Sequence, residues 1–211
     1  MGYFEKYQVD VPEGTSGNWS VSRFTVSKES AESGRLRAFV SMSRRYVPEG
    51  TYTQLKRGDE IVMSDTPDEI QDHLNAIRRA SGRCLVAGLG LGMVAHAMLR
   101  KPGVKHVTIV EKSPDVIKLV GPWLISQFPG LVTIVEADIL TWEPPKGEKW
   151  DITWFDIWDQ ICGDNIDDMK KLHRRFARRA GWKGSWARDE VERANEEWAR
   201  SPWNPKNRSH R

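Results

Sequence analysis

Hydrophobic and polar positions follow two different patterns in two parts of the chain. Between residues 19 and 64, short alternations of apolar and polar residues are separated by turn sequences, which predicts a small antiparallel sheet of three or four strands. These segments read WSVSRFTV at 19–26, LRAFVSMS at 36–43, TYTQL at 51–55 and EIVMS at 60–64. Residues 1–18 contain Gly, Pro and Ser and are expected to form a loose lead-in.

The middle of the chain carries longer apolar runs. A helix is predicted from Pro67 to about Ala80, because Asp65 or Thr66 can cap it and Pro67 suits its first turn. Apolar runs then alternate with helical patterns, as in βαβ units whose parallel sheet is covered on both faces. The runs read RCLVAG at 83–88, HVTIVE at 106–111, LVTIVEAD at 131–138 and WDITWFDIW at 150–158.

Beyond residue 162 only helical signals remain, over 165–179 and 185–200. The parallel sheet is therefore expected to end at its fourth strand, with an edge that the C-terminal helices cover or a homodimer pairs. This organisation divides the chain into three parts. They are a lead-in and small β domain at 1–64, a sheet-and-helix domain at 65–162 and a basic helical segment at 163–211.

Composition narrows the class of protein. Apolar residues make up 39% of the chain and charged residues 29%, a mixture that can bury a core and excludes global disorder. No apolar run approaches the roughly 18 residues of a membrane span, and the N-terminus lacks the features of a signal peptide. We therefore expect a cytoplasmic protein that does not enter a membrane. Cys84 and Cys162 suggest neither a disulfide framework nor a zinc site, and no metal is expected.

The net charge of +3 is unevenly distributed. Residues 165–211 carry 13 Lys or Arg against 7 Asp or Glu, whereas the rest of the chain is mildly acidic. Such a basic segment is interpreted either as a solvated helix face or as a surface that binds nucleic acid, and the first interpretation is favoured.

The strongest chemical signal is a glycine-rich turn between the first apolar run and the next helix. Gly88, Gly90 and Gly92 allow close approach of a ligand to the backbone, and the helix N-terminus offers free N–H groups. Acidic residues follow at the ends of the later runs. They are Glu111, Asp138, Asp156 and Asp159. A glycine loop and acids at the carboxyl ends of parallel strands mark the crevice in which open α/β sheets bind ligands.

Four segments carry a family resemblance when they are taken in order. They read GLGLG at 88–92, VTIVEKSPDVI at 107–117, VTIVEADILTW at 132–142 and DITWFDIWD at 151–159. Together they resemble class I S-adenosylmethionine-dependent methyltransferases, especially the spermidine synthase branch and small methyltransferases of phage and prophage genomes. The resemblance covers about residues 50 to 160. It implies a Rossmann-like α/β fold of the class I methyltransferase type. The apolar pattern departs from that family in ending the sheet after strand four, and it adds the small N-terminal antiparallel β domain.

The resemblance also implies S-adenosylmethionine as the cofactor. Glu111 would hold the ribose hydroxyls, and Asp138 would accept a hydrogen bond from the adenine amino group. The implied cofactor-binding set is Gly88, Leu89, Gly90, Gly92, Glu111, Lys112, Asp138, Ile139 and Asp156. Asp156, and secondarily Asp159, are the candidate catalytic residues, as a base or as groups that orient an amine.

Other functions remain open at this point. The pair Asp156 and Asp159 would suit a polyamine, so aminopropyl transfer from decarboxylated S-adenosylmethionine is the alternative reaction. Leu91 stands where spermidine synthases carry an aspartate, which counts against that cofactor. A non-catalytic module that binds a nucleotide or a protein partner is the alternative of another class. The sequence does not define the acceptor, whether small molecule or macromolecule.

Histidines and tryptophans near these segments are interpreted as structural. His73, His96 and His106 have no Cys or acid at metal-ligand spacing, which favours packing roles. Trp154 and Trp158 flank the candidate site in sequence, where they could stack on a substrate or on the adenine ring. Aromatic residues in such runs more often belong to the core, and that interpretation is favoured.

Overall fold

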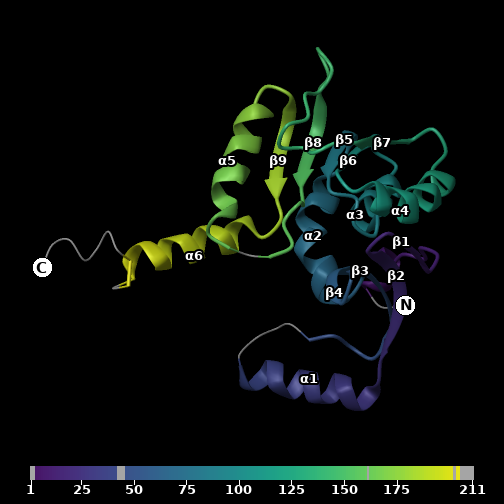
Figure 1. The fold of residues 1–211 in the computed structure, drawn as a ribbon, viewed down its shortest axis with the longest axis vertical. Helices are drawn as coiled ribbons and strands as arrows, with labels where there is room; N and C mark the ends of the chain where they lie inside the picture. Colours follow the sequence, from purple (N-terminus) through teal and green to yellow (C-terminus); the bar gives the residue numbers. More distant parts are fainter. Residues whose placement is uncertain (1–2, 42–45, 161, 202, 205–211) are drawn as a thin grey trace, which may run out of the picture.

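The computed structural model describes residues 3–41, 46–160, 162–201 and 203–204 and shows an α/β protein with two sheets (Figure 1). The N-terminal sheet has four antiparallel strands in the order β1-β2-β3-β4. They are β1 (Gly14–Ser16), β2 (Trp19–Val26), β3 (Gly50–Arg57) and β4 (Glu60–Ser64). The structure confirms the small antiparallel sheet and adds β1, which lies inside the expected lead-in.

One of the segments predicted as a strand forms a helix instead. Helix α1 (Lys28–Val40) begins at Ser27, whose side chain accepts a hydrogen bond from the Ser30 N–H. The prediction of a strand over 36–43 is wrong for residues 36–40, and residues 42–43 lie outside the described residues. Helix α1 lies apart from both sheets (Figure 1).

The second sheet has five parallel strands in the order β7-β6-β5-β8-β9. They are β5 (Gly82–Ala87), β6 (Val104–Glu111), β7 (Val132–Glu136), β8 (Trp150–Phe155) and β9 (Ala180–Ser185). The chain runs from β5 through β6 to β7 on one side and returns to β8 on the other. This reversal creates a switch point between β5 and β8, where open α/β sheets bind ligands at the carboxyl ends of the strands.

The expectation that the sheet ends at a fourth strand is wrong. Strand β9 pairs in parallel with β8, with Ile152 opposite Trp182 and Phe155 opposite Ser185. Its sequence AGWKGS contains two glycines, a lysine and one large apolar residue, so it lacks the apolar run that marks a buried strand. The sheet therefore continues beyond the predicted boundary at residue 162, and its free edge on this side is β9.

Helices cover the parallel sheet on both faces. The helices on these faces are α2 (Pro67–Arg79), α3 (Met93–Leu99), α4 (Pro114–Gln127) and α5 (Asn165–Arg175). The chain also forms α6 (Arg188–Arg200), which packs on α5, and a 3-10 helix η1 (Glu5–Tyr7) near the N-terminus. One face packs against α2, α3, α4 and the antiparallel sheet around Val86 and Ile109. The other packs against α5, where Phe155 meets Leu172 and Phe176. The predicted helix over 67–80 is confirmed as α2, and Thr66 is its N-cap residue.

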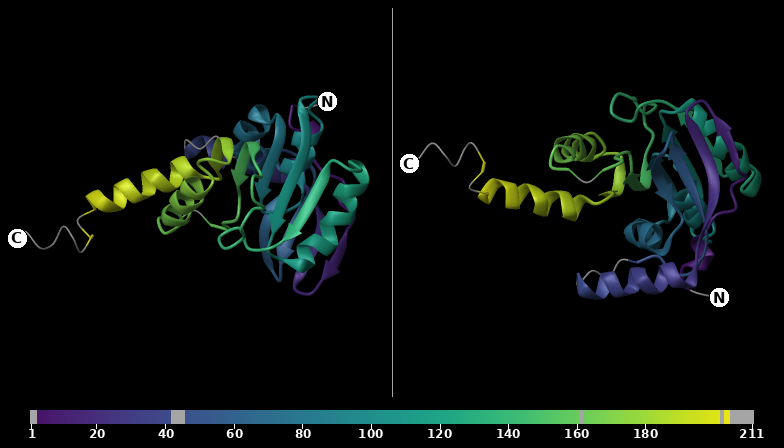
Figure 2. Two further views of the ribbon diagram at one scale, coloured as in Figure 1. Left: turned by 90° about the horizontal axis from the view of Figure 1, so that it is seen from above. Right: turned by 60° about the horizontal axis from the view of Figure 1, so that its bottom comes forward.

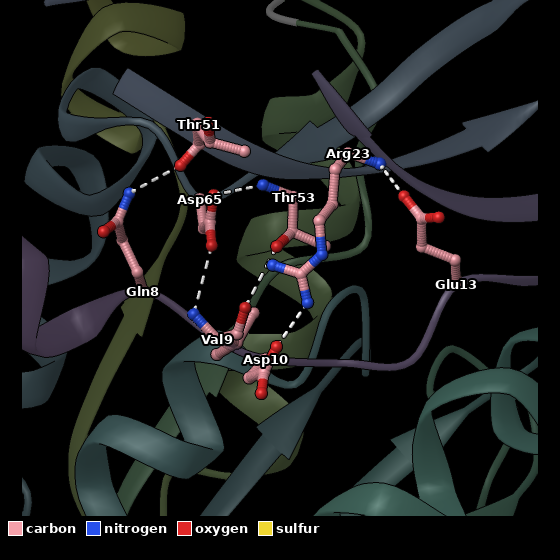
Figure 3. Close-up of polar contacts among 8 residues, drawn as sticks. All are labelled: Gln8, Val9, Asp10, Glu13, Arg23, Thr51, Thr53 and Asp65. Carbon is pink, nitrogen blue, oxygen red and sulfur yellow. Dashed lines mark hydrogen bonds and ion pairs between the residues drawn. The ribbon is translucent and has the colours of Figure 1, made fainter. Parts of the chain in front are cut away.

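Residues 9–10 bind to the antiparallel sheet rather than forming a loose lead-in (Figure 3). The Asp65 carboxylate accepts hydrogen bonds from the Val9 N–H at 3.0 Å and the Thr53 N–H at 2.7 Å. The Thr53 hydroxyl donates to the Val9 carbonyl at 3.0 Å, and Arg23 pairs with Asp10. Asp65 therefore bonds to this segment and to β3 instead of capping α2.

Helix α6 runs outward from the sheets towards the C-terminus (Figure 2). Of its residues only Val191 is buried, against Ile166 and Met169 of α5. Among the described residues, no helix combines the length and the apolar character that crossing a lipid bilayer requires.

Candidate functional site

The glycine loop after β5 adopts a backbone that side chains would disturb. Gly88, Gly90 and Gly92 all have positive φ, at +94°, +50° and +71°. A Cβ at Gly88 would overlap the carbonyl oxygen of Asp156, and one at Gly90 would overlap the sulfur of Met63. Gly92 is the N-cap residue of α3. The loop is therefore held closely between β4 and the segment that follows β8.

Glu111, at the end of β6, is buried beneath this loop. One carboxylate oxygen accepts a hydrogen bond from the Leu89 N–H at 2.8 Å, and the other accepts one from the Ser113 N–H at 2.8 Å. A carboxylate has about four acceptor positions, so two remain for hydroxyl groups of a ligand. Glu111 thus orients the loop and can still bind a diol.

The turn after β7 carries Asp138 and Ile139. The Asp138 carboxylate accepts a hydrogen bond from the Leu140 N–H at 2.8 Å, which fixes its position, and Ile139 is buried. The Arg175 guanidinium of α5 donates to the Ile139 and Leu140 carbonyls. Arg175 therefore ties this turn to α5 and is a positioning residue that the sequence did not reveal.

A cavity of about 250 Å³ lies at the carboxyl ends of the parallel strands. It brings together most of the predicted site residues. Those that line it are Gly88, Gly90, Glu111, Lys112, Asp138, Ile139, Asp156 and Asp159. Leu89 and Gly92 contribute through the backbone, as the donor to Glu111 and as the start of α3. Strands β3 and β4 close the cavity from the other side through Leu55, Arg57 and Met63.

Asp156 follows β8 directly and lies at the switch point of the sheet. Burial, reinforced by the negative charges of Asp72, Asp159 and Glu111, raises the pKa of its carboxyl group to about 7. Its nearest basic partner is His73 of α2, whose Nε2 lies 3.7 Å from the Asp156 Oδ2. Burial lowers the pKa of the His73 imidazole to about 4, so this ring is neutral at physiological pH.

Asp159 has a different environment from Asp156. Its carboxylate pairs with Arg57 of β3 at 2.9 Å. Arg57 also pairs with Glu60 at 3.0 Å and lies over the Trp19 ring, 5.6 Å from its centroid. Asp159 therefore links the rim of the cavity to the antiparallel sheet, and its carboxylate is already engaged by a cation.

His73 belongs to the cavity although sequence reasoning gave it a packing role. It lies on the buried stripe of α2 with Ile70, Leu74 and Ile77. The helical spacing of His73 from these apolar residues was the signal in the sequence that this side chain is buried. The contributions of Arg57 and Met63 carry no comparable signal, since they depend on how the two sheets pack.

The remaining histidines and tryptophans divide between core and cavity. Trp154 is buried and stacks on Trp182 at 6.3 Å between ring centroids, whereas Trp158 lines the cavity. His96 packs in the core between Trp123 and Phe128. Within the described part of the chain, no group of three or more His, Cys, Asp or Glu is arranged to hold a metal ion.

Comparisons with known proteins give only distant structural likenesses. No protein-family model matches the sequence, and no curated protein does. The structure is similar to N-methyltransferase NodS from Bradyrhizobium japonicum WM9, with a TM-score of 0.45 and 15% identity over 61% of this chain and 74% of that one. It is also similar to an S-adenosylmethionine-dependent methyltransferase from Clostridium acetobutylicum ATCC 824, with a TM-score of 0.38 and 19% identity over 54% and 44%.

A third likeness is to a dimethyladenosine transferase from Plasmodium falciparum, with a TM-score of 0.38 and 20% identity. It covers 49% of this chain but only 36% of that chain, so this protein spans about a third of its length. Likenesses with TM-scores of 0.38 to 0.45 carry no argument about function. The function has to be argued from the cavity itself.

Proposed function

We propose that this chain is an S-adenosylmethionine-dependent methyltransferase whose active site is the cavity at the switch point of the parallel sheet. The observation that carries the proposal is the convergence of four separate segments on that cavity. They are the glycine loop after β5, Glu111 at the end of β6, the Asp138–Ile139 turn after β7 and Asp156 after β8. The sequence resemblance to class I methyltransferases supports the same assignment.

The groups that line the cavity fit the chemistry of this cofactor. Glu111 keeps acceptor positions for the two ribose hydroxyls, and Asp138 can accept from the adenine amino group while Ile139 supplies an apolar surface for the ring. Gly88 and Gly90 line the cavity without side chains, so the methionine part can lie against the backbone.

When bound, the cofactor supplies a methyl group on a sulfonium centre, which is already electrophilic. The chain then needs to position the acceptor, exclude water and remove a proton where the acceptor loses one. Asp156 is the group placed for that last task. Its pKa of about 7 leaves a substantial fraction ionised at neutral pH, which suits a general base.

The geometry gives less support to aminopropyl transfer. The position that would recognise a decarboxylated cofactor is Leu91, which is fully buried and donates its N–H to the Met63 sulfur at 3.3 Å. Asp159 is paired with Arg57 instead of being available for a second amine.

Calorimetric titration with S-adenosylmethionine, its decarboxylated form and S-adenosylhomocysteine tests the proposal. We expect the first and third ligands to bind and the decarboxylated form to bind more weakly. Preference for the decarboxylated form would instead favour aminopropyl transfer. Binding without methylation of any amine, nucleic acid or protein would favour the non-catalytic module.

A further inference from the structure

His73 is a buried imidazole on the wall of the cavity, beside the candidate base. It projects from α2, is 1% exposed, and places Nε2 3.7 Å from the Asp156 Oδ2. The other ring nitrogen, Nδ1, has no hydrogen-bond partner in the structure. The ring is held edge-on against Trp154, 5.9 Å between centroids, and Trp154 stacks in turn on Trp182.

Packing alone does not explain an imidazole at this position. A buried polar atom without a partner is unfavourable, so each one in a folded protein calls for an explanation. His96 provides the internal comparison, because this half-buried histidine also has a buried Nδ1 without a hydrogen-bond partner. His96 packs between aromatic rings in the core, whereas His73 lines the cavity beside a carboxyl group.

The charges that raise the pKa of Asp156 are all negative, and the basic side chain that approaches its carboxylate is His73. Asp72 of α2, Glu111 of β6 and Asp159 beyond β8 all act on Asp156 as negative charges. The nearby cation Arg57 of β3 is engaged by Asp159 and Glu60. An ionised Asp156 therefore gains stabilisation from an N–H donor directed at its carboxylate, even one on a neutral ring.

We propose that His73 is the positioning residue for general-base catalysis, with its Nε2–H directed at the Asp156 carboxylate. This assignment rests on the proposed methyl transfer. A movement of a few tenths of an ångström brings the two atoms within hydrogen-bond distance, and catalytic hydrogen bonds are often long before ligands bind. His73 then stabilises the ionised form of Asp156 and fixes which oxygen faces the acceptor.

The proton balance of the step is simple. A lone pair of the acceptor forms the bond to the methyl carbon, and the carbon–sulfur bond breaks with its electron pair passing to sulfur. The proton that the acceptor loses goes to the Asp156 carboxylate, which becomes a neutral carboxyl group. His73 stays neutral throughout and changes only from donating to a carboxylate to contacting a carboxylic acid.

The first test determines which ring nitrogen of His73 carries the proton in the unaltered protein. Nitrogen-15 NMR of labelled histidine distinguishes the Nε2–H from the Nδ1–H tautomer at pH 7. We expect His73 to be neutral with its proton on Nε2. A proton on Nδ1 would leave no donor facing Asp156 and would overturn the proposal.

The second test follows the titration of Asp156 by carbon-13 NMR of labelled aspartate. His73→Leu removes the donor, so the Asp156 midpoint should rise by about one pH unit, because a hydrogen bond to the charged form is lost. His73→Gln retains an N–H near the Nε2 position and should leave the midpoint close to that of the unaltered protein. His96→Gln and His96→Leu are the matched controls and should not move it.

The NMR measurements need no cofactor, so the two proposals fail in different ways. Equal Asp156 midpoints in His73→Leu and His96→Leu, with S-adenosylmethionine binding intact, would overturn the role of His73 alone. If calorimetry on the same samples shows no binding of S-adenosylmethionine, the proposed function fails, and the role of His73 in methyl transfer fails with it.

Discussion

Gly88 lies where the glycine loop meets the segment after β8, and its environment excludes any side chain. Its φ is +94°, and an added Cβ would overlap the backbone oxygen of Asp156. Gly88→Ala should lower the free energy of unfolding by about 2 kcal/mol or more, since strained backbone costs roughly 1–3 kcal/mol before the overlap is counted. Urea unfolding measures the loss.

Two other glycines separate the causes of that effect. Gly130 has a φ of +76° with no atom near an added Cβ, so Gly130→Ala should show the cost of backbone strain alone. Gly103 has open space and no positive φ, and Gly103→Ala should change stability by less than about 0.5 kcal/mol. An equal loss for Gly88→Ala and Gly130→Ala would show that the contact with Asp156 is unimportant.

The raised pKa of Asp156 predicts a pH dependence of stability. The carboxyl pKa is about 7 in the folded chain and near 3.8 when unfolded, so the folded state holds the proton more tightly. Between these values only the folded state is protonated, and the free energy of unfolding should fall as pH rises, by at most about 1.4 kcal/mol per unit. Denaturation of both proteins from pH 4 to 8 should show that the free energy of unfolding of Asp156→Asn, relative to that of the unaltered protein, increases as pH rises. A constant difference would contradict the shifted pKa.

The positions of many candidate site residues could be predicted from the sequence, because these residues follow the ends of predicted strands. The carboxyl ends of parallel strands meet at one edge, so Glu111, Asp138 and Asp156 could be placed together from the order of the apolar runs. Helical spacing places His73 on the buried stripe of α2 but not beside Asp156, and it gives no signal for Arg57 of the antiparallel sheet. Their positions depend on packing between layers, which sequence spacing does not encode.

At the scale of elements, the apolar pattern predicts strands whose burial comes from their own side chains. It fails for β9, where Gly184 lies against the ring of Trp154 from β8 and the ring of Trp182, the one large apolar residue of β9 itself. It also fails for α1, since Leu36, Ala38 and Val40 alternate like a strand while Ser27 caps a helix. For β9 the surroundings override local propensity, whereas for α1 the local helix cap prevails over the alternating pattern.

Truncation tests the contribution of β9 against that of α6. Ending the chain after residue 187 removes α6 and mainly the burial of Val191, which should cost about 2 kcal/mol. Ending it after residue 179 also removes the pairing with β8 and the packing of Trp182 on Trp154, and should cost at least about twice as much. Equal thermal unfolding curves for the two truncations would show that β9 adds nothing to the sheet.

At the scale of the whole molecule, most basic side chains of the described C-terminal segment bind acidic or carbonyl groups of the protein itself. Seven of the ten Lys and Arg that the structure describes between residues 165 and 204 pair with acids or bind carbonyl oxygens. Lys206, Arg208 and Arg211 lie outside the described residues. This internal use favours a solvated helical surface over a nucleic-acid interface.

Fluorescence anisotropy with labelled single- and double-stranded oligonucleotides checks that interpretation. We expect only non-specific binding, with a Kd of about 10⁻⁴ to 10⁻⁶ M at physiological salt and a steep loss as salt is raised. Binding that is much tighter and depends on sequence would instead indicate a nucleic-acid acceptor.

The most direct test of cofactor binding compares two glutamates at the ends of neighbouring strands. Glu111 and Glu136 stand opposite each other in the register of β6 and β7, but only Glu111 lines the cavity. Calorimetric titration of S-adenosylmethionine should show Glu111→Gln weakened by about 1.5–3 kcal/mol, the range for hydrogen bonds to a charged group, and Glu136→Gln unchanged. Equal affinity in the two variants, or no binding to the unaltered protein, would contradict the assignment of this cavity.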